Sequence, residues 1–188
     1  MTLQKGLGKG FAVPLIAAAM VASGASAAMV SFSSVFTNNT LADKVYDIRS
    51  ALSLTSPLGN TAGSGTLAIV VSDIRGGGAY VKSVGPTALY TSFVKGVKVA
   101  EMGPAFTLSA SAFGQNSYTD SFNKTSYGVS TTINDVIDEK FKFILSAGDQ
   151  AVVSGTFVVV SAVPAPGAIG LVGIAGGFAV RGRRRENL

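Results

Sequence analysis

Short runs in which apolar and polar residues alternate are the feature that most limits the folds open to this chain. In Phe106–Phe113 the residues at even positions are apolar, and Thr and Ser occupy the odd positions up to 111. Thr66–Ser72 and Ala151–Ser161 are apolar runs rich in β-branched residues. A period of two indicates a strand with one face in water, and a continuous β-branched run indicates a strand buried on both faces.

Between residues 28 and 163 we count eight to ten such segments, separated by turns that contain Gly, Pro or Asn. This spacing predicts an all-β fold: an antiparallel two-sheet β-sandwich with a jelly-roll-like topology. The predicted strands are Val30–Phe36, Thr66–Ser72, Tyr80–Val84, Ala88–Val94, Val97–Glu101, Phe106–Phe113, Tyr127–Ile133, Phe141–Leu145 and Ala151–Ser161. Residues 114–124 are predicted to be a long loop with some strand, and Asn134-Asp135 is predicted to open a turn or a short helical piece.

One segment, residues 41–52, fits two structures equally well. Its apolar residues are spaced by four, three and four positions, as on one face of a helix, and Thr40 could cap that helix. The serines and β-branched residues between 45 and 54 suit a strand instead. The sequence leaves both alternatives open here.

The absence of three residue types excludes several kinds of chemistry. The chain contains no cysteine, no histidine and no tryptophan. Stability must therefore come from packing and sheet hydrogen bonds and not from disulfide bridges. A Ser-His-Asp or Cys-His catalytic site is impossible, and a zinc site would need carboxylates alone. We predict no catalytic residues, no metal site and no cofactor, and expect that the chain is not an enzyme.

The first 27 residues have the three parts of a secretory signal peptide. Lys5 and Lys9 form a positive start, and the apolar stretch Phe11–Ala22 follows. A small-x-small sequence then gives a signal peptidase its cleavage site, which we place between residues 27 and 28. The residues of this site are Ala25, Ala27 and Ala28. A retained transmembrane anchor is the alternative, but the apolar stretch is short for spanning a bilayer.

The other end of the chain carries an apolar stretch followed by a basic cluster. Ala168–Val180 has no charge, and as a helix it would extend only about 20 Å. A bilayer core is about 30 Å thick, so this is a short, weak membrane segment. The arginines that would stop export and stay on the cytoplasmic side are Arg181, Arg183, Arg184 and Arg185. A permanent tail anchor is the alternative interpretation.

A proline motif precedes this tail, and its residues are Val163, Pro164, Ala165, Pro166 and Gly167. The motif, the apolar stretch and the basic end together resemble the C-terminal sorting signal of PEP-CTERM proteins, the exosortase substrates of Gram-negative bacteria. Alanine stands at position 165, where the commonest family form has glutamate. The resemblance is limited to the last 26 or so residues, and it implies nothing about the activity of residues 28–163.

If the resemblance holds, it implies a route and a set of partners. Sec-type export machinery and signal peptidase would act first, and the inner membrane would then hold the tail transiently. An exosortase-like enzyme would cut near Pro164–Gly167, and the protein would reach the cell surface or the extracellular matrix. The domains expected are 1–27 (signal peptide), 28–162 (β-sandwich) and 163–188 (sorting signal).

The basic character of the chain comes from these two end segments. Lys5, Lys9 and the four tail arginines, less Glu186, account for the whole formal charge of +5. Residues 28–163 are therefore neutral, and the charge is not a nucleic-acid footprint.

Carboxylates and aromatic residues are the remaining candidates for a site. Asp135, Asp138 and Glu139, next to Asn134, have the oxygen ligands that calcium prefers, but a solvated turn is the interpretation that we favour for them. A pair of carboxylates could also cleave a glycosidic bond, but nothing in the sequence selects a pair.

Three aromatic residues lie in a stretch rich in Ser, Thr and Asn, where they could stack on sugars or plug one end of the sandwich: Tyr118, Phe122 and Tyr127. We therefore expect an exported structural or adhesive protein. A secreted carbohydrate-binding module, with extracellular polysaccharide as its partner, is the alternative. A carboxylate-dependent glycoside hydrolase is a third hypothesis.

Overall fold

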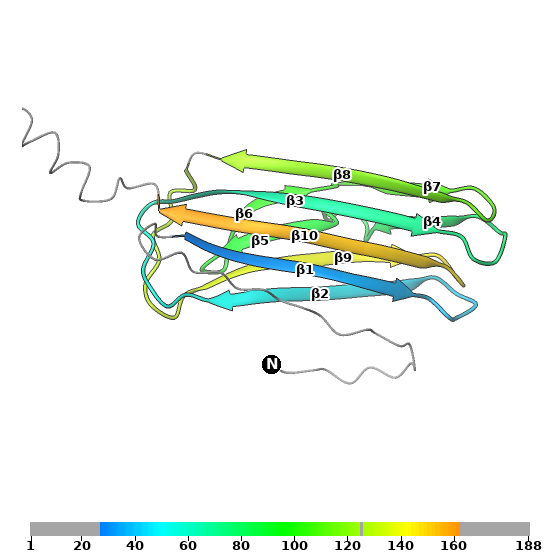
Figure 1. Cartoon of the computed structure of the whole chain (residues 1–188), viewed down its shortest axis with the longest axis horizontal. Helices are drawn as coiled ribbons and strands as arrows, with labels where there is room; N and C mark the ends of the chain where they lie inside the picture. The colour runs from blue at the N-terminus through cyan, green and yellow to red at the C-terminus, as the bar shows by residue number, and fades with distance from the viewer. Residues whose placement is uncertain (1–26, 125, 162–188) are drawn as a thin grey trace, which may run out of the picture.

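A computed structural model of the chain describes residues 27–124 and 126–161 (Figure 1). Every regular element in this part of the chain is a β-strand, and it contains no helix that is long and apolar enough to cross a membrane. Most of the predicted signal peptide, the 163–167 motif and the tail arginines lie outside the described residues. Of the predicted cleavage site, only Ala27 and Ala28 are described.

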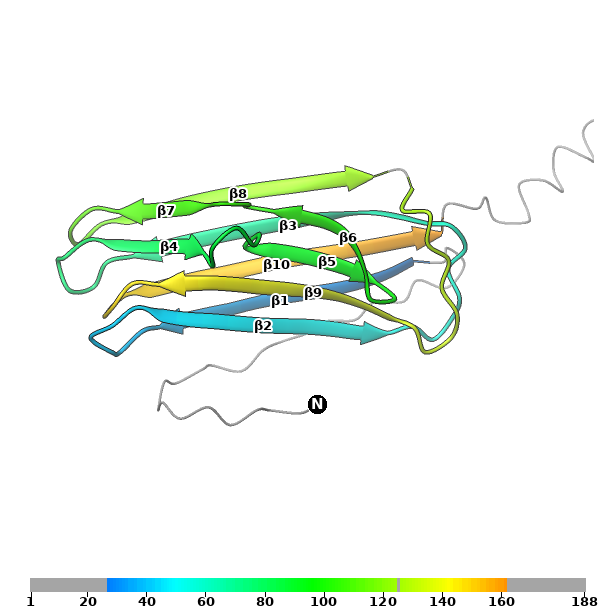
Figure 2. The ribbon, with the colours of Figure 1, turned by 180° about the vertical axis from the view of Figure 1, so that it is seen from behind.

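The ten strands form two antiparallel sheets that pack face to face (Figures 1 and 2). The four-stranded sheet has the order β1 (Ala27–Thr37), β10 (Gln150–Ser161), β3 (Thr61–Ser72), β8 (Gln115–Lys124). The six-stranded sheet contains β2 (Lys44–Ser53), β9 (Val136–Leu145), β4 (Ala79–Ser83), β5 (Tyr90–Val94), β6 (Val97–Met102) and β7 (Thr107–Ala110). The predicted two-sheet antiparallel architecture is confirmed.

Strand β9 organises the six-stranded sheet. One of its sides pairs with β2 over its whole length, and the other side pairs first with β5 and then with β4. Strands β4 and β5 thus act as one interrupted strand, and β7 and β6, which pair with them, act as another. The sheet is therefore four strands wide, which matches the width of the sheet that it covers.

The ambiguous segment at residues 41–52 is a strand. Tyr46, Ile48 and Leu52 are partly buried and pack against the core from β2. Val45 is 54% exposed, and Leu41 is 89% exposed in the preceding loop. The apparent helical face is thus divided between the two sides of an extended chain, because a strand sends odd and even positions to opposite faces.

Two predictions around residues 114–133 are wrong. Residues 115–124 are not a loop but the edge strand β8, which pairs with β3 without a break. Residues 127–133 are not a strand, although the N–H of Tyr127 donates to Thr61 and the N–H of Thr131 donates to Leu58. Gly128 and Asn134 have positive φ values of 68° and 71°, which end an extended conformation.

Strand boundaries also differ from prediction at several other places. Strand β3 begins at Thr61 and not at Thr66, β1 begins at Ala27 and not at Val30, and β5 begins at Tyr90 and not at Ala88. The strand predicted at Phe106–Phe113 ends at Ala110, and Phe113 has a positive φ of 52° in the next turn. The strand predicted to begin at Phe141 begins at Val136. This longer strand includes Asp138 and Glu139, which the sequence had placed near a turn.

The core between the sheets consists of two apolar clusters. Phe32, Phe141 and Phe143 belong to the larger cluster, whereas Ile137 and Phe157 belong to the smaller. The rings of Phe32 and Phe141 are in contact, with their centroids 4.9 Å apart. Aromatic packing of this kind supplies much of the buried area that a cysteine-free sandwich needs.

Candidate functional site

The two ends of the described domain lie side by side. Ala27 is opposite Val160, and Ala28 is opposite Val159, in the pairing of β1 with β10. Strand β10 ends at Ser161, two residues before the 163–167 motif. Figure 1 shows both of these strand ends at one end of the sandwich, which we call the terminal end. The connections β1–β2, β3–β4, β7–β8 and β9–β10 lie at the opposite, distal end, one strand length of about 35 Å away.

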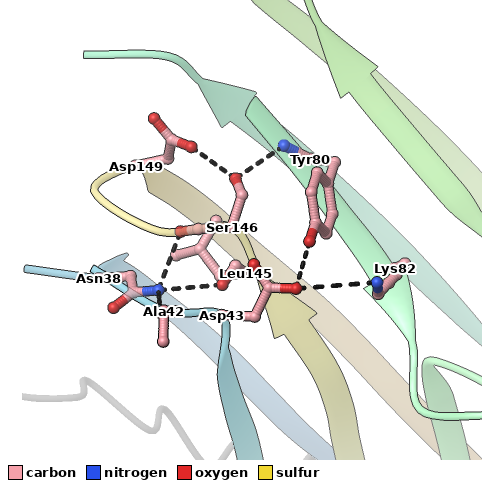
Figure 3. A network of polar contacts seen from close by, with 8 residues as sticks. All are labelled: Asn38, Ala42, Asp43, Tyr80, Lys82, Leu145, Ser146 and Asp149. Atoms are coloured by element: carbon pink, nitrogen blue, oxygen red, sulfur yellow. Dashed lines mark hydrogen bonds and ion pairs between the residues drawn. The ribbon is translucent and has the colours of Figure 1, made fainter. Parts of the chain in front are cut away.

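Asn38 ties two of the distal connections together (Figure 3). Its side-chain amide donates hydrogen bonds to the carbonyls of Ala42, Leu145 and Ser146, at 2.8, 3.1 and 2.9 Å. The hydroxyl of Ser146 donates to Asp149 over 2.5 Å and accepts from the N–H of Tyr80. The β1–β2 and β9–β10 connections are therefore fixed to each other and to β4.

Asp73 fixes the other two distal connections. One of its carboxylate oxygens accepts from the N–H groups of Arg75 and Gly76, and the other accepts from those of Gly78 and Phe113. Burial raises the pKa of Asp73, but the four N–H donors outweigh this effect and hold the pKa well below its usual value. The charged carboxylate thus holds the β3–β4 and β7–β8 connections together.

At the edge of the distal end, Asp43 accepts a hydrogen bond from the hydroxyl of Tyr80 (Figure 3). The ammonium of Lys82 lies 3.8 Å from the same carboxylate and 4.7 Å from the centre of the Tyr80 ring. The hydrogen bond to Asp43, together with burial, raises the pKa of Tyr80 to about 12. This hydroxyl therefore stays protonated, which suits a hydrogen-bond donor and not a base or nucleophile.

The outer face of the six-stranded sheet is charged and hollowed. An open depression of about 440 Å³ lies over β5, β6 and β9. The residues that define it include Thr91, Phe93, Lys98, Glu101, Lys140 and Lys142. A second depression, of about 450 Å³, shares Phe93 and Lys140 with the first and continues to Asp47, Arg49 and Asp138. We call the two together the charged groove.

Most charges in the groove are already paired. Lys140 lies 3.1 Å from Asp47, and Lys98 lies 2.7 Å from Glu101. These four side chains are between 38% and 57% exposed. Exposed ion pairs contribute little to stability, so a polar ligand can replace them at small cost. Phe93 is half-buried between these charges and offers an apolar surface at the junction of the two depressions.

The outer face of the four-stranded sheet differs in composition from the charged outer face of the six-stranded sheet. Within residues 27–124 and 126–161, no charged side chain lies on it. One row across the sheet consists of Ser31, Thr156, Thr66 and Ser121, and another consists of Val35, Val152, Val70 and Ser117. The hydroxyls of Thr66 and Thr156 are 2.7 Å apart and hydrogen-bonded. This face is a regular array of small hydroxyl and methyl groups.

The three carboxylates that the sequence grouped as a candidate calcium site are not brought together. Asp135 accepts from Thr132 and lies 3.3 Å from Lys95, whereas Asp138 faces outward and pairs with Arg49 at 2.7 Å. Glu139 points into the core and is fully buried. The described part of the chain contains no group of three or more acidic residues that could hold a metal ion. A solvated turn is equally wrong for residues 138 and 139, because both are buried in β9.

The three aromatic residues that could either stack on sugars or plug the sandwich pack into the sandwich. The ring of Tyr118 lies 4.4 Å from that of Phe106. Phe122 and Tyr127 both pack against Phe157, at 6.1 and 6.3 Å. Their role is to close the core, which was the other interpretation of the sequence. Phe93, the aromatic side chain in the charged groove, was missed, although the alternation along residues 88–94 places it on the face opposite Tyr90.

Comparison with known proteins gives fold-level likenesses only. No known protein family and no curated protein matches the sequence. TmCBM61 in complex with beta-1,4-galactotriose is 8% identical, with a TM-score of 0.34, over 77% of this chain and 87% of that one. The apo form of a cyclase from Fischerella sp. is also 8% identical, with a TM-score of 0.30, over 77% and 78%.

A third likeness is to a carbohydrate binding module from Cellvibrio mixtus lichenase 5A in complex with cellotriose. It is 10% identical, with a TM-score of 0.19, over 79% of this chain and 88% of that one. Because all three TM-scores are below 0.5, these likenesses carry no argument about what this chain binds.

Proposed function

We propose that this chain is an exported, surface-sorted adhesive protein that holds extracellular polysaccharide in the charged groove and catalyses no reaction. The observation that carries the proposal is the groove itself, which lies on a rigid sheet and combines Phe93 with charges of both signs. Sugar hydroxyls both donate and accept hydrogen bonds, so lysine ammonium groups and carboxylates can each engage them. The apolar face of a sugar ring fits against an aromatic ring.

The acidic residues in the groove support binding and not hydrolysis. Glu101 is paired with Lys98, Asp47 with Lys140, and Asp138 with Arg49. Each of these carboxylates is thus already engaged by a cation, so the groove offers no free pair of carboxyl groups to flank a glycosidic bond. A carbohydrate-binding module is therefore a closer comparison for this site than a glycoside hydrolase.

The positions of the chain ends support the proposed route of export. Cleavage before Ala28 would leave the new N-terminus in β1, beside the end of β10 that leads to the 163–167 motif. A tail held at the inner membrane would then have the terminal end of the sandwich nearest the membrane and leave the groove accessible. Signal peptidase, Sec-type export and an exosortase-like enzyme remain proposals that rest on the sequence resemblance. The strand order and the crossings between sheets support the jelly-roll topology that we propose for the domain.

Affinity electrophoresis of the full chain through gels that contain different soluble polysaccharides tests the groove. We expect at least one polysaccharide to retard the protein, and Phe93→Ala and Lys140→Ala each to weaken binding about tenfold, the effect of losing one good contact. Thr119→Ala, on the uncharged face, is the matched control and should bind normally. Unchanged melting temperatures of the variants would exclude unfolding as the cause of weaker binding. Equal binding by all four proteins, or no retardation by any polysaccharide, would contradict the proposal.

A further inference from the structure

The edge strands of the two sheets are protected against pairing to very different degrees. Strand β2 carries Lys44, Asp47 and Arg49. Strands β6 and β7 form an interrupted edge with a register shift between β5 and β6. Strand β8 has Asp120 and Lys124 on its inward side. Charges, interruptions and bulges of this kind are the usual means by which proteins prevent a sheet edge from pairing with another chain.

Strand β1 has none of these protections. It is 11 residues long, contains no charged residue and no proline, and pairs with β10 without a bulge. Its other side pairs with no strand that the structure describes. The residues that point outward include Ser33 and Val35, and both are exposed. The backbone N–H and C=O groups along this side are a template for one more strand.

We propose that β1 of one copy pairs antiparallel with β1 of a second copy across a two-fold axis, which joins two four-stranded sheets into one of eight strands. An identical antiparallel strand is complementary to itself, so this contact closes as a dimer. The described residues include as many acidic as basic side chains, so two copies do not repel each other through net charge. The uncharged outer face, with its rows of serine, threonine and valine, then continues from one copy to the other across the β1–β1 pair.

The two-fold axis places the terminal ends of the two copies at opposite ends of the dimer, because the two β1 strands run in opposite directions. If the proposed sorting is correct, neighbouring copies held in one membrane cannot form this contact. Copies released from the membrane, or held on two facing surfaces, can do so. This consequence rests on the proposed function, whereas the dimer itself does not.

Sedimentation velocity of the full chain in mild detergent tests the dimer. We expect a concentration-dependent dimer for the wild type and a monomer for Ser33→Lys, since a charged side chain on a free edge strand opposes pairing with another chain. Ala51→Lys is the matched control, because Ala51 is also exposed on an edge strand, in the other sheet. It should remain a dimer. A monomeric wild type, or equal behaviour of the two lysine variants, would overturn the proposal.

A cross-linking experiment covers the case in which Ser33→Lys fails to fold. The chain has no cysteine, so each cysteine variant carries a single thiol. Mild oxidation should give a covalent dimer with at least one of Ser31→Cys, Ser33→Cys and Val35→Cys. Ser121→Cys, on β8, should stay monomeric. A disulfide dimer through position 121 alone would show that a different edge pairs. These results do not depend on polysaccharide binding, so the groove and the dimer can fail separately.

Discussion

Glu139 and Ser92 face each other across β9 and β5, and both side chains point into the core, where neither is exposed to solvent. On β9, Glu139 lies between Ile137 of the smaller apolar cluster and Phe141 of the larger. Neither carboxylate oxygen of Glu139 has a hydrogen-bond partner among the described residues. The core is therefore divided by a thin polar layer whose carboxyl group is strongly desolvated.

This layer predicts an unusual dependence of stability on pH. Burial raises the pKa of Glu139 from 4.5 to about 8, and the nearby hydroxyl of Tyr90 opposes the shift only in part. In the unfolded chain the group loses its proton near its ordinary pKa, and in the fold it keeps the proton until about pH 8. Between these values unfolding releases a proton, so the free energy of unfolding should fall by about 1.4 kcal/mol per pH unit.

Glu139→Gln should remove this slope, because glutamine stays neutral at every pH. Urea denaturation at several pH values between 5 and 8 provides the measurement. Glu101→Gln, which changes an exposed glutamate on β6, is the control and should keep the slope. If Glu139→Gln and wild type lose stability equally as the pH rises, Glu139 is not buried as the structure places it.

A substitution at Gly155 tests how tightly the two sheets pack. A Cβ atom at this position would lie 2.8 Å from Cζ of Phe141 and 3.1 Å from the carbonyl oxygen of Thr66. Phe141 is fully buried and cannot move aside freely. Gly155→Ala should therefore lower the free energy of unfolding by about 1–3 kcal/mol. Gly77→Ala, where no atom lies within 4 Å of the new Cβ, should change it little. Equal effects in urea denaturation would show that the sheets are farther apart.

A substitution at Asp73 tests how strongly this carboxylate stabilises the loops of the distal end. Asparagine retains one acceptor oxygen but replaces the other with an NH2 group, so Asp73→Asn loses two of the four N–H acceptor contacts. We expect the amides of Gly78 and Phe113 to exchange with solvent at least about tenfold faster. The exposed Asp47→Asn should leave both rates unchanged. Because the pKa of Asp73 is lowered, its contribution to stability should be present above the unfolded value of 3.8 and disappear as the pH falls below it.

The sequence predicted the sheets well, because alternation and turn residues are local signals. Leu108 and Ala110 turn inward as their pattern indicates, and Gly148 forms its turn with a φ of 80°. The sequence missed β8 because a strand at a sheet edge is exposed on most of its surface and can be as polar as a loop. It also misplaced Glu139, since an acidic residue beside Asp138 normally indicates a solvated turn.

The candidate groove could not be predicted in the same way. Phe93, Lys140 and Asp47 are far apart in the sequence and meet only because β5 and β2 pair with opposite sides of β9. Pairing between distant strands depends on the whole fold and leaves no local pattern. The uncharged face of the other sheet was visible in principle as runs of Ser, Thr and Val, but the strand order was needed to place those runs side by side.

Our central claim is that the described sandwich is an exported domain between two end segments that are removed. The intact mass of the protein recovered from the cells that produce it tests this claim most directly. We predict a polypeptide that begins at Ala28 and has lost about the last 20 residues, as expected if a cut falls near the 163–167 motif and removes the apolar segment. A mass that still includes Met1 and Arg183–Arg185 would contradict the account.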